Sequence, residues 1–422
     1  MKILFTSDLH LNMSDYGVMD KEVPHVPFRT MDALRAFEFI VDKAINEIKP
    51  SLFIVNGDIY DNARPSVFVN SFFYKQLNRL GDNNIGVILL LGNHDVGKNF
   101  HPLEPLQSLN LKKVKIIDEP KILSIKDLNL MCFPFSRDIA NRSISIKEKF
   151  NLFLEECDDK LSNDSSLNIF CGHFPVNGAV MSKHNVKSLK DVSLGKSKLI
   201  NNNSNDISLK DIHRINADYV FLGDYHQSQK LKIHKQAYYS GSIERTDISE
   251  LEEQKGFYIL DTDSKDLVFE EITCLRDMIN LKGTYDNMLK QISKARYNPE
   301  KFKNPIIKLS FVGNSAEYFV FQNNLGDLKN KLISSYAPIH LFDTKKILKS
   351  EQYTEEEEIF DDISVPGINE SFFHESLEDS PHVDKSLLQS VATEILNGLN
   401  ETEDVTKKAS FYMNKYFEEI NI

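Results

Sequence analysis

The strongest constraint on the fold is a turn in which polar side chains directly follow an apolar run. Residues Val87–Leu91 form a continuous apolar segment, which predicts a buried β-strand. Gly92 then lets the backbone turn sharply, and Asn93, His94 and Asp95 follow it. Open α/β sheets place their chemistry at the carboxyl ends of parallel strands, because the loops there converge in a crevice. The segment therefore predicts a functional site at the end of a central strand.

The same pattern recurs along the chain. Apolar segments followed by carboxylate or imidazole side chains occur also at 3–6, 52–55, 167–170 and 219–222. Amphipathic helices are predicted between the first three strands, over 30–48 and 67–80. This alternation of strand and helix predicts an α/β fold with parallel strands. The polar residues gathered at the strand ends are Asp8, His10, Asp58, Asn93, His94, His173, Asp224 and His226.

The chemistry of this set indicates a metal site. Carboxylate, imidazole and amide groups together suit a pair of divalent cations of Mn, Fe or Zn character. Two ions held by one bridging carboxylate can activate water and neutralise the charge that develops on a phosphoester. Each residue taken alone has a simpler interpretation: Asp8 or Asp58 as a helix cap, and any single histidine as a structural residue. Five strand ends with the same chemistry favour the metal site.

The composition is that of an ordinary globular protein. Of the 422 residues, 41% are hydrophobic and 27% are charged. No apolar run approaches the roughly 20 residues that a membrane helix needs. The first residues lack the features of a signal peptide, so we expect a cytoplasmic location. Frequent Asn, Lys and Ile indicate an AT-rich genome. If that genome belongs to a phage, the expected location is the cytoplasm of its host. The scattered cysteines favour buried free thiols over disulfides or zinc: Cys132, Cys157, Cys171 and Cys274.

The net charge of -12 comes from one segment. Residues 350–382 contain eleven acidic side chains and neither Lys nor Arg, and without them the net charge is -1. The overall acidity therefore does not exclude a polyanionic substrate. We expect 350–382 to be an acidic, disordered linker. Residues 383–422 predict two amphipathic helices, which either dock on a partner or pack on the body of the protein.

Residues 275–349 predict a small α+β domain with one clear strand, at 306–312. The domain is rich in lysine, and these side chains face either DNA phosphates or solvent. They are Lys282, Lys290, Lys294, Lys301, Lys303 and Lys308.

The strand-end motifs resemble those of the calcineurin-like metallophosphoesterases. They are Asp8-Leu-His10, Gly57-Asp58, Gly92-Asn93-His94-Asp95, Gly172-His173 and Gly223-x-x-His226. Within 57–65 and 239–257, further motifs resemble SbcD-type nuclease subunits. The resemblance covers about the first 260 residues. It implies a four-layer α/β sandwich, with two central β-sheets flanked by helices, a small α+β cap domain and a helical C-terminal tail. The implied division is a nuclease domain at 1–274, a capping and DNA-binding domain at 275–349, an acidic linker at 350–382 and a helical partner-docking element at 383–422.

The resemblance also implies a ligand set for two Mn²⁺ ions, with Mg, Fe or Zn as alternatives. One ion would be bound by Asp8, His10 and His226, the other by Asn93, His173 and Asp224, and both by Asp58. His94 would protonate the leaving oxygen or stabilise the transition state, and Asp95 would orient the His94 ring. The family usually has His where this chain has Asp224. The second metal site is therefore either retained in altered form or weakened.

The functional prediction is a metal-dependent DNA nuclease, exonuclease or endonuclease, that acts in repair, recombination or replication. The implied partners are DNA, as duplex ends or single strands, and an SbcC-type ABC ATPase whose coiled-coil base binds the C-terminal helices. We expect no membrane partner. A homodimer is expected through the helix at 67–80, although core burial explains Phe68, Phe72 and Phe73 equally well. The alternatives are a small-molecule phosphodiesterase or protein phosphatase on the same core, or a DNA-binding scaffold with a decayed site.

Overall fold

A computed structural model describes residues 1–15, 19–20, 22–97, 100–109, 111, 113–161, 166–180, 206–294, 305–335 and 340–347. The chain divides into two units, at 1–349 and 350–422. The predicted acidic linker at 350–382 and the predicted docking helices at 383–422 lie outside the described residues.

The first large sheet contains the three strands that the sequence predicts near the N-terminus. Its strand order is β14–β13–β1–β2–β3–β4. The strands β1 to β4 are parallel, whereas β13 pairs with β1, and β14 with β13, in antiparallel fashion. The bounds are β1 Lys2–Thr6, β2 Leu52–Asn56, β3 Gly86–Leu90, β4 Val114–Ile117, β13 Gly256–Asp261 and β14 Leu267–Glu271.

The second large sheet has the order β11–β12–β10–β7–β6–β5. Its central strands β12, β10, β7 and β6 are parallel, and its two outer strands pair antiparallel to their neighbours. The bounds are β5 Lys121–Ile125, β6 Leu128–Phe133, β7 Leu167–His173, β10 Tyr219–Gly223, β11 Gln229–Lys230 and β12 Gln236–Tyr239. Two short strands, β8 Val176–Asn177 and β9 Ile207–Ser208, pair separately.

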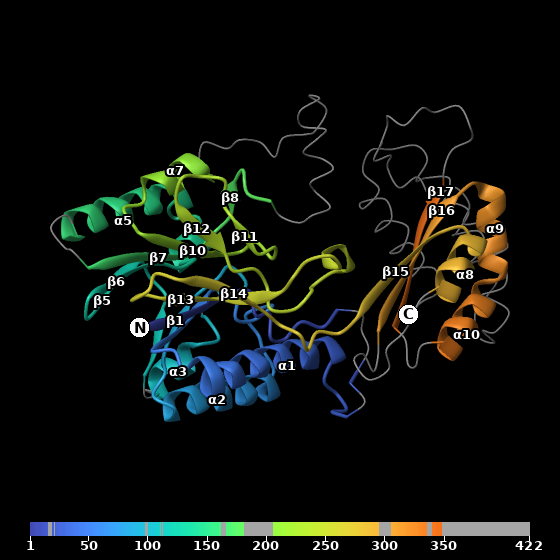
Figure 1. The fold of residues 1–422 in the computed structure, drawn as a ribbon, viewed down its shortest axis with the longest axis horizontal. Helices are drawn as coiled ribbons and strands as arrows, with labels where there is room; N and C mark the ends of the chain where they lie inside the picture. Colours follow the sequence, from blue (N-terminus) through green and yellow to red (C-terminus); the bar gives the residue numbers. More distant parts are fainter. Residues whose placement is uncertain are drawn as a thin grey trace, which may run out of the picture. The chain divides into compact units, whose positions relative to one another are not determined.

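Helices cover the outer face of each large sheet (Figure 1). The helices that accompany the first sheet are α1 Phe28–Lys43, continued by the π-helix η1 Ala44–Ile48, α2 Val67–Asp82 and α3 Glu104–Leu109. Those that accompany the second are α4 Arg137–Ala140, α5 Ile146–Leu161 and α7 Leu209–Arg214. The start of α2 is fixed by Ser66, whose side chain accepts a hydrogen bond from the Val69 N–H. The predicted helices at 30–48 and 67–80 are thus confirmed.

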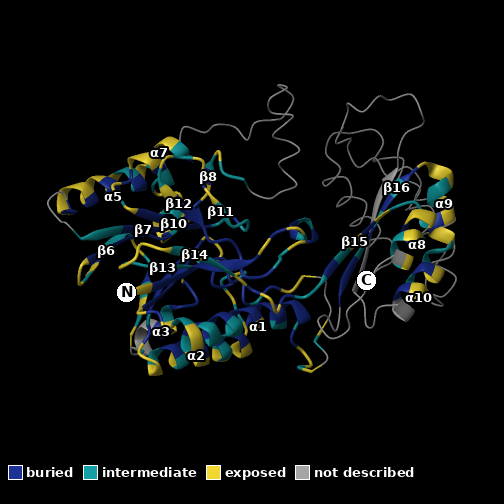
Figure 2. Ribbon diagram, viewed as in Figure 1, coloured by how far each residue is buried: buried dark blue, intermediate teal, exposed yellow. Residues whose placement is uncertain are grey.

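The apolar core lies in three layers. The central cluster joins the inner faces of the two sheets, where the rings of Phe5 and Phe221 stack with centroids 3.8 Å apart. The other two lie between each sheet and its helices, with Phe37 and Phe73 in one and Phe150 in the other. Buried residues accordingly concentrate on the strands, and exposed ones on the outer faces of the helices (Figure 2). The implied fold, an α/β sandwich of two β-sheets flanked by helices, is confirmed.

A third, smaller sheet lies near the C-terminal end of the described chain. Three parallel strands, in the order β15–β16–β17, pack with three helices around a separate apolar cluster that includes Leu309 and Leu332. The bounds are β15 Met278–Gly283, α8 Tyr285–Lys294, β16 Ile306–Gly313, α9 Ser315–Asn323, α10 Leu325–Ser335 and β17 His340–Ile347. The predicted strand at 306–312 is confirmed as β16. The sequence did not reveal β15 and β17, because polar residues interrupt their apolar pattern.

One sequence expectation about a single side chain needs correction, and one alternative that the sequence left open is decided in part. All four cysteines are free thiols as expected, but Cys274 is exposed instead of buried. Of the three aromatic residues considered for a dimer interface, Phe73 is fully buried in the core, whereas Phe68 on the same helix is 39% exposed. The division of the chain at 274 and 349 and the homodimer remain predictions.

Candidate metal centre

The loops after β1 and β2 run side by side and carry three of the predicted ligands. Asp8, His10 and Asp58 all adopt left-handed backbone conformations, with φ of 51°, 44° and 51°. Two backbone hydrogen bonds join the loops, from the Asp8 N–H to the Gly57 carbonyl (3.0 Å) and from the His10 N–H to the Asp58 carbonyl (3.1 Å). Such conformations are costly for residues other than glycine and tend to occur at functional sites.

Glycine is required beside these ligands for two different reasons. Gly57 has φ of +86°, and a Cβ atom there would lie 2.2 Å from Nδ1 of His173. Gly92 does not adopt a positive φ, but a Cβ atom there would lie 2.1 Å from Oδ1 of Asp58. The sequence predicts Gly92 as a turn residue, whereas its main role is to let the loop after β3 approach Asp58 closely.

The loop after β3 brings in the predicted catalytic pair. The exposed His94 donates its backbone N–H to Oδ1 of Asp58 at 3.0 Å, and its ring nitrogen Nδ1 lies 2.6 Å from the carbonyl oxygen of Asp61. Asp95 is fully buried, and its carboxylate accepts three backbone N–H groups, from Ile59, Tyr60 and Gly92. The expectation that Asp95 orients the His94 ring is therefore wrong. The Asp61 carbonyl orients the ring, and Asp95 holds the loops together.

The second sheet contributes the remaining ligands from the ends of β7 and β10. The buried ring of His173 lies with Nε2 2.9 Å from Oδ1 of Asn93 and 3.3 Å from Oδ1 of Asp58. A carboxylate oxygen of Asp224 lies 3.9 Å from the same nitrogen. The backbone of Asp224, with φ of 102°, is strained, and its N–H donates to Oδ1 of Asp8 at 3.0 Å. The loops of both sheets therefore meet at one point.

His226 completes the other side of the cluster. Its Nε2 lies 3.1 Å from Nε2 of His10, and its Nδ1 lies 2.9 Å from Oε1 of Glu250. The Nδ1 of His10 lies 3.3 Å from Oδ1 of Asp61. Glu250 favours a proton on Nδ1 of His226, and the two Nε2 atoms then either share one further proton or both direct a lone pair at a cation. The close approach of two imidazole nitrogens is therefore compatible with a bound cation.

A cation also explains the surroundings of His173. Its Nδ1 donates to the Asn56 carbonyl at 2.7 Å, and oxygen acceptors of Asn93 and Asp58 face Nε2, so without a metal Nε2 must carry a proton and the ring a positive charge, a place that a divalent cation can take. The buried Oδ2 of Asp8 has no hydrogen-bond partner among the described residues. Nitrogen and oxygen lone pairs that converge without donors fit divalent cations.

Electrostatics agree with a site that needs positive charge. Burial opposes ionisation of Asp58, but the neighbouring His173 ring outweighs it and holds the pKa of this carboxyl below its ordinary range. Burial, reinforced by the charges of Asp8 and Asp58, raises the pKa of Asp224 to about 6. Negative charge at Asp224 is therefore unfavourable until a cation neutralises it.

The predicted residues come together as the sequence implied, and Asp61 joins them. Three groups of side chains lie close enough for one ion each: Asp8, His10 and His226; Asp8, Asp58 and His173; and His10, Asp61 and His94. Carboxylate and imidazole groups of this kind are typical of a dimetal phosphoesterase. Sequence reasoning missed Asp61 as a site residue, although its position three residues after Asp58 was a usable signal. It also missed Glu250, which no local pattern marks.

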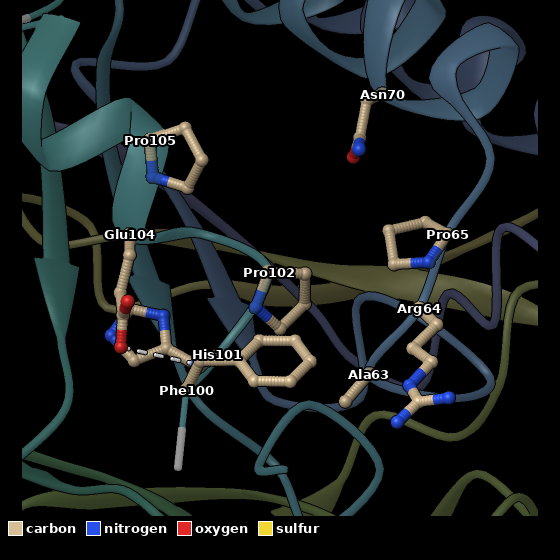
Figure 3. Close-up of a pocket in the computed structure, with 9 residues that line it drawn as sticks. All are labelled: Ala63, Arg64, Pro65, Asn70, Phe100, His101, Pro102, Glu104 and Pro105. Carbon is tan, nitrogen blue, oxygen red and sulfur yellow. Dashed lines mark hydrogen bonds between the residues drawn. The ribbon is translucent and has the colours of Figure 1, made fainter.

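An open hollow of about 500 Å³ lies beside the loops that carry Asp61 and His94. Figure 3 shows Arg64 and Pro65 on one side of it and Glu104 and Pro105 on the other. The ring of Phe100, which is 38% exposed, also lines it, as does the buried His101. The hollow therefore offers the cationic side chain of Arg64 and an aromatic ring on the chain segments that follow Asp61 and His94.

Comparisons with known proteins agree with this geometry. The sequence profile of the calcineurin-like phosphoesterases matches residues 1–228. The chain is 23% identical over 328 residues to the SbcD subunit of the nuclease SbcCD from Staphylococcus epidermidis, covering 74% of this chain and 80% of that protein. It is 23% identical over 316 residues to the DNA double-strand break repair protein Mre11 of Methanocaldococcus jannaschii, covering 72% and 76%. In the described part of the chain, no helix combines the length and apolarity needed to cross a membrane.

Proposed function

Because the chain belongs to the calcineurin-like phosphoesterase family, a family of metal-dependent hydrolases, we propose that it is a DNA nuclease. The observation that carries the proposal is the convergence of carboxylate, imidazole and amide groups from five strand ends on one point. The similarity to SbcD and Mre11 supports DNA as the substrate, since it extends over about three quarters of the chain. Repair, recombination or replication of DNA is the proposed setting.

We assign the ligands as the family resemblance implies. Asp8, His10 and His226 would hold one ion, Asn93, His173 and Asp224 the other, and Asp58 would bridge them. Divalent cations, Mn²⁺ in our proposal, would supply positive charge to the phosphodiester and increase the acidity of the attacking water. Asp224 replaces an imidazole with a hard carboxylate oxygen, which suits Mn²⁺ and whose negative charge a neighbouring cation would stabilise.

Proton transfer and positioning would be carried out by residues that are not proposed metal ligands. Asp61 holds the His94 ring through Nδ1, so the ring can present Nε2 to the substrate. In its protonated form His94 would give a proton to the leaving oxygen as the phosphorus–oxygen bond breaks. Asp95 keeps the loops after β2 and β3 in register through its three backbone hydrogen bonds.

The composition of the hollow supports a nucleic acid over a small phosphoester. Arg64 can pair with a phosphate, and Phe100 offers a ring on which a base can stack. A protein phosphatase or small-molecule phosphodiesterase is the second candidate, since it would use the same metal cluster. A DNA-binding scaffold is disfavoured because the ligand atoms still converge.

Cleavage assays separate these candidates. End-labelled duplex and single-stranded DNA, and the small diester bis(4-nitrophenyl) phosphate, are incubated with Mn²⁺ or with a chelator. We expect Mn²⁺-dependent cleavage of all three. Cleavage of the small diester alone would support the second candidate, and cleavage of none would support the scaffold.

The proposed partners can be tested separately. We propose that residues 383–422 bind an SbcC-type ABC ATPase, that the lysines of 275–349 contact DNA and that α2 contributes to a homodimer. Deletion of 383–422 should leave DNA cleavage unchanged and prevent co-purification with the ATPase. Co-purification at unchanged affinity would contradict the docking proposal.

A further inference from the structure

The outer side of the His226 ring is held by a buried network. Oε1 of Glu250 lies 2.9 Å from Nδ1 of His226, and the hydroxyl of Thr246 lies 3.0 Å from the same nitrogen. The Thr246 hydroxyl in turn donates to the same Glu250 oxygen at 2.7 Å. A carboxylate at this position fixes the proton on Nδ1 and leaves the Nε2 lone pair directed into the cluster.

The other oxygen of Glu250 is fixed equally well. Oε2 lies 2.7 Å from the ammonium of the buried Lys255 and accepts the Thr246 backbone N–H at 3.0 Å. Lys255 also donates to the backbone carbonyl of His226 at 3.0 Å and pairs with Glu253 at 3.0 Å. Lys255 and Glu250 therefore hold the backbone and the ring of His226 at once.

Glu250 ends a short 3-10 helix, η2 (Ile248–Glu250), whose other end faces the small sheet. Ile248 packs in one apolar cluster with Phe28, Met278 and Ile306. Met278 and Ile306 are the paired first residues of β15 and β16. One helical turn thus contacts both a proposed metal ligand and the sheet β15–β16–β17.

We propose that Glu250 is a positioning residue for the His226 imidazole and that η2 couples this imidazole to the sheet β15–β16–β17. The inference rests on the metal-binding role proposed for His226. A shift of the small sheet against η2 would move Glu250 and so change how well His226 meets a cation. By reciprocity, binding of the cation would restrain the small sheet.

Calorimetric titration with MnCl₂ tests the positioning role. We expect Glu250→Ala to weaken Mn²⁺ binding at one of two sites by about 10- to 100-fold. Glu250→Gln keeps an acceptor for the Nδ1 proton and should restore most of the affinity. Glu253→Gln is the matched control, because it also removes a partner of Lys255 while leaving the His226 ring contact intact, and it should bind Mn²⁺ like the wild type. Equal affinity in Glu250→Ala and wild type would overturn the proposal.

A metal-free measurement keeps this role separate from the proposed function. At alkaline pH, where imidazole is neutral, ¹⁵N shifts report which ring nitrogen carries the proton. We expect the wild type and Glu250→Gln to carry it on Nδ1 of His226, and Glu250→Ala to show a mixture. If the wild type binds no Mn²⁺ but the shifts behave in this way, the metal assignment fails and the positioning role stands. An unchanged tautomer in Glu250→Ala would refute the positioning role by itself.

The coupling is tested from the side of the small sheet. Ile248→Ala, with Ile248→Val as a milder variant, should weaken Mn²⁺ binding by about 2- to 30-fold. Leu332→Ala is the control, and it should bind Mn²⁺ like the wild type. Leu332 is buried in the small sheet's own apolar cluster and lies outside the cluster of Ile248. In hydrogen exchange, Mn²⁺ should slow exchange of the β15 and β16 amides in the wild type and not in Ile248→Ala. Unchanged Mn²⁺ affinity in Ile248→Ala would overturn the coupling.

Discussion

The second sheet contributes two imidazoles to the cluster, and they differ in the kind of group that holds Nδ1. The Nδ1 of His173 donates to a backbone carbonyl, that of Asn56 at the end of β2. The Nδ1 of His226 is held by the side chains of Glu250 and Thr246, which follow β12 in the chain. The His173 ring is therefore held by the main chain of a sheet strand, whereas the His226 ring is held by two side chains that a substitution can remove. The difference means that a substitution can release the His226 ring from its partner, but cannot remove the main-chain partner of the His173 ring.

The largest effect is expected where the two sides meet. Asp58 lies with Oδ1 3.3 Å from Nε2 of His173 and Oδ2 3.8 Å from Nε2 of His10. Asp58→Ala should abolish hydrolysis of both DNA and the small diester, because it removes the ligand that the two proposed ions would share. Asp82→Ala, which replaces a carboxylate at the end of α2, serves as the control for protein quality. Circular dichroism should show an intact fold, and activity near the wild-type level under Mn²⁺ would contradict the two-ion site.

The second-largest effect is expected at His94, which in the described part of the chain forms no hydrogen bond with the His173 ring or the His226 ring. His94 contacts the Asp61 carbonyl and is not among the proposed ligands. His94→Ala should lower turnover by about 10²- to 10⁴-fold, as expected for a lost general acid, and leave the Mn²⁺ content unchanged. Elemental analysis measures the metal, and the exposed His213→Ala is the control. A loss of one ion from His94→Ala would place His94 in the ligand set.

The His173 side can be altered at Asp224. Asp224→His should keep activity with Mn²⁺ and increase Zn²⁺ affinity by about tenfold, because imidazole is the softer ligand. Asp224→Ala should weaken one of two ions. Calorimetric titration of both variants with each metal is the measurement. A single Mn²⁺ ion in all three proteins would instead indicate a decayed second site.

The smallest effects concern stability without metal. The folded-state pKa of Asp224, about 6, lies above its ordinary value of 3.8. Between these values the folded chain binds more protons than the unfolded one, so this carboxyl penalises folding most above pH 6 and not at all below pH 3.8. In a chelator, Asp224→Asn should therefore raise stability near neutral pH by at most about 3 kcal/mol, and the gain should fade on acidification. Denaturant titrations across this range are the test, and a gain that persists at the acid end would contradict it.

Asp95 gives the opposite result although burial raises its pKa to about 6 as well. Its carboxylate accepts three backbone N–H groups that Asp95→Ala would leave buried without a partner. At about 1–3 kcal/mol for each, the loss should exceed the gain from removing the charge. Thermal unfolding in a chelator should show a clear fall in stability, and an unchanged midpoint would mean that these hydrogen bonds contribute nothing.

The strands that carry the site and the proposed ligands could be read from the sequence because their signals are local. An apolar run such as Val87–Leu91 predicts β3, and a Gly followed by polar residues marks where a strand meets the site. Parallel strands bring such ends to one edge, so Asp8, Asp58 and His94 could be placed together without a structure. Strands β15 and β17 were not predicted, because polar residues interrupt their apolar pattern.

What surrounds the ligands was decided by the tertiary structure. The sequence assigned Asp95 to the His94 ring because the two are adjacent, but adjacent residues at a turn point in different directions, and Asp95 turns inward to the backbone of the β2 loop. Glu250 lies 24 residues from His226, and nothing in its neighbours marks it as a partner. Which side chains converge across the chain depends on how the two sheets pack. Local pattern thus specified the strands and the ligand types, and only packing specified which group holds each imidazole.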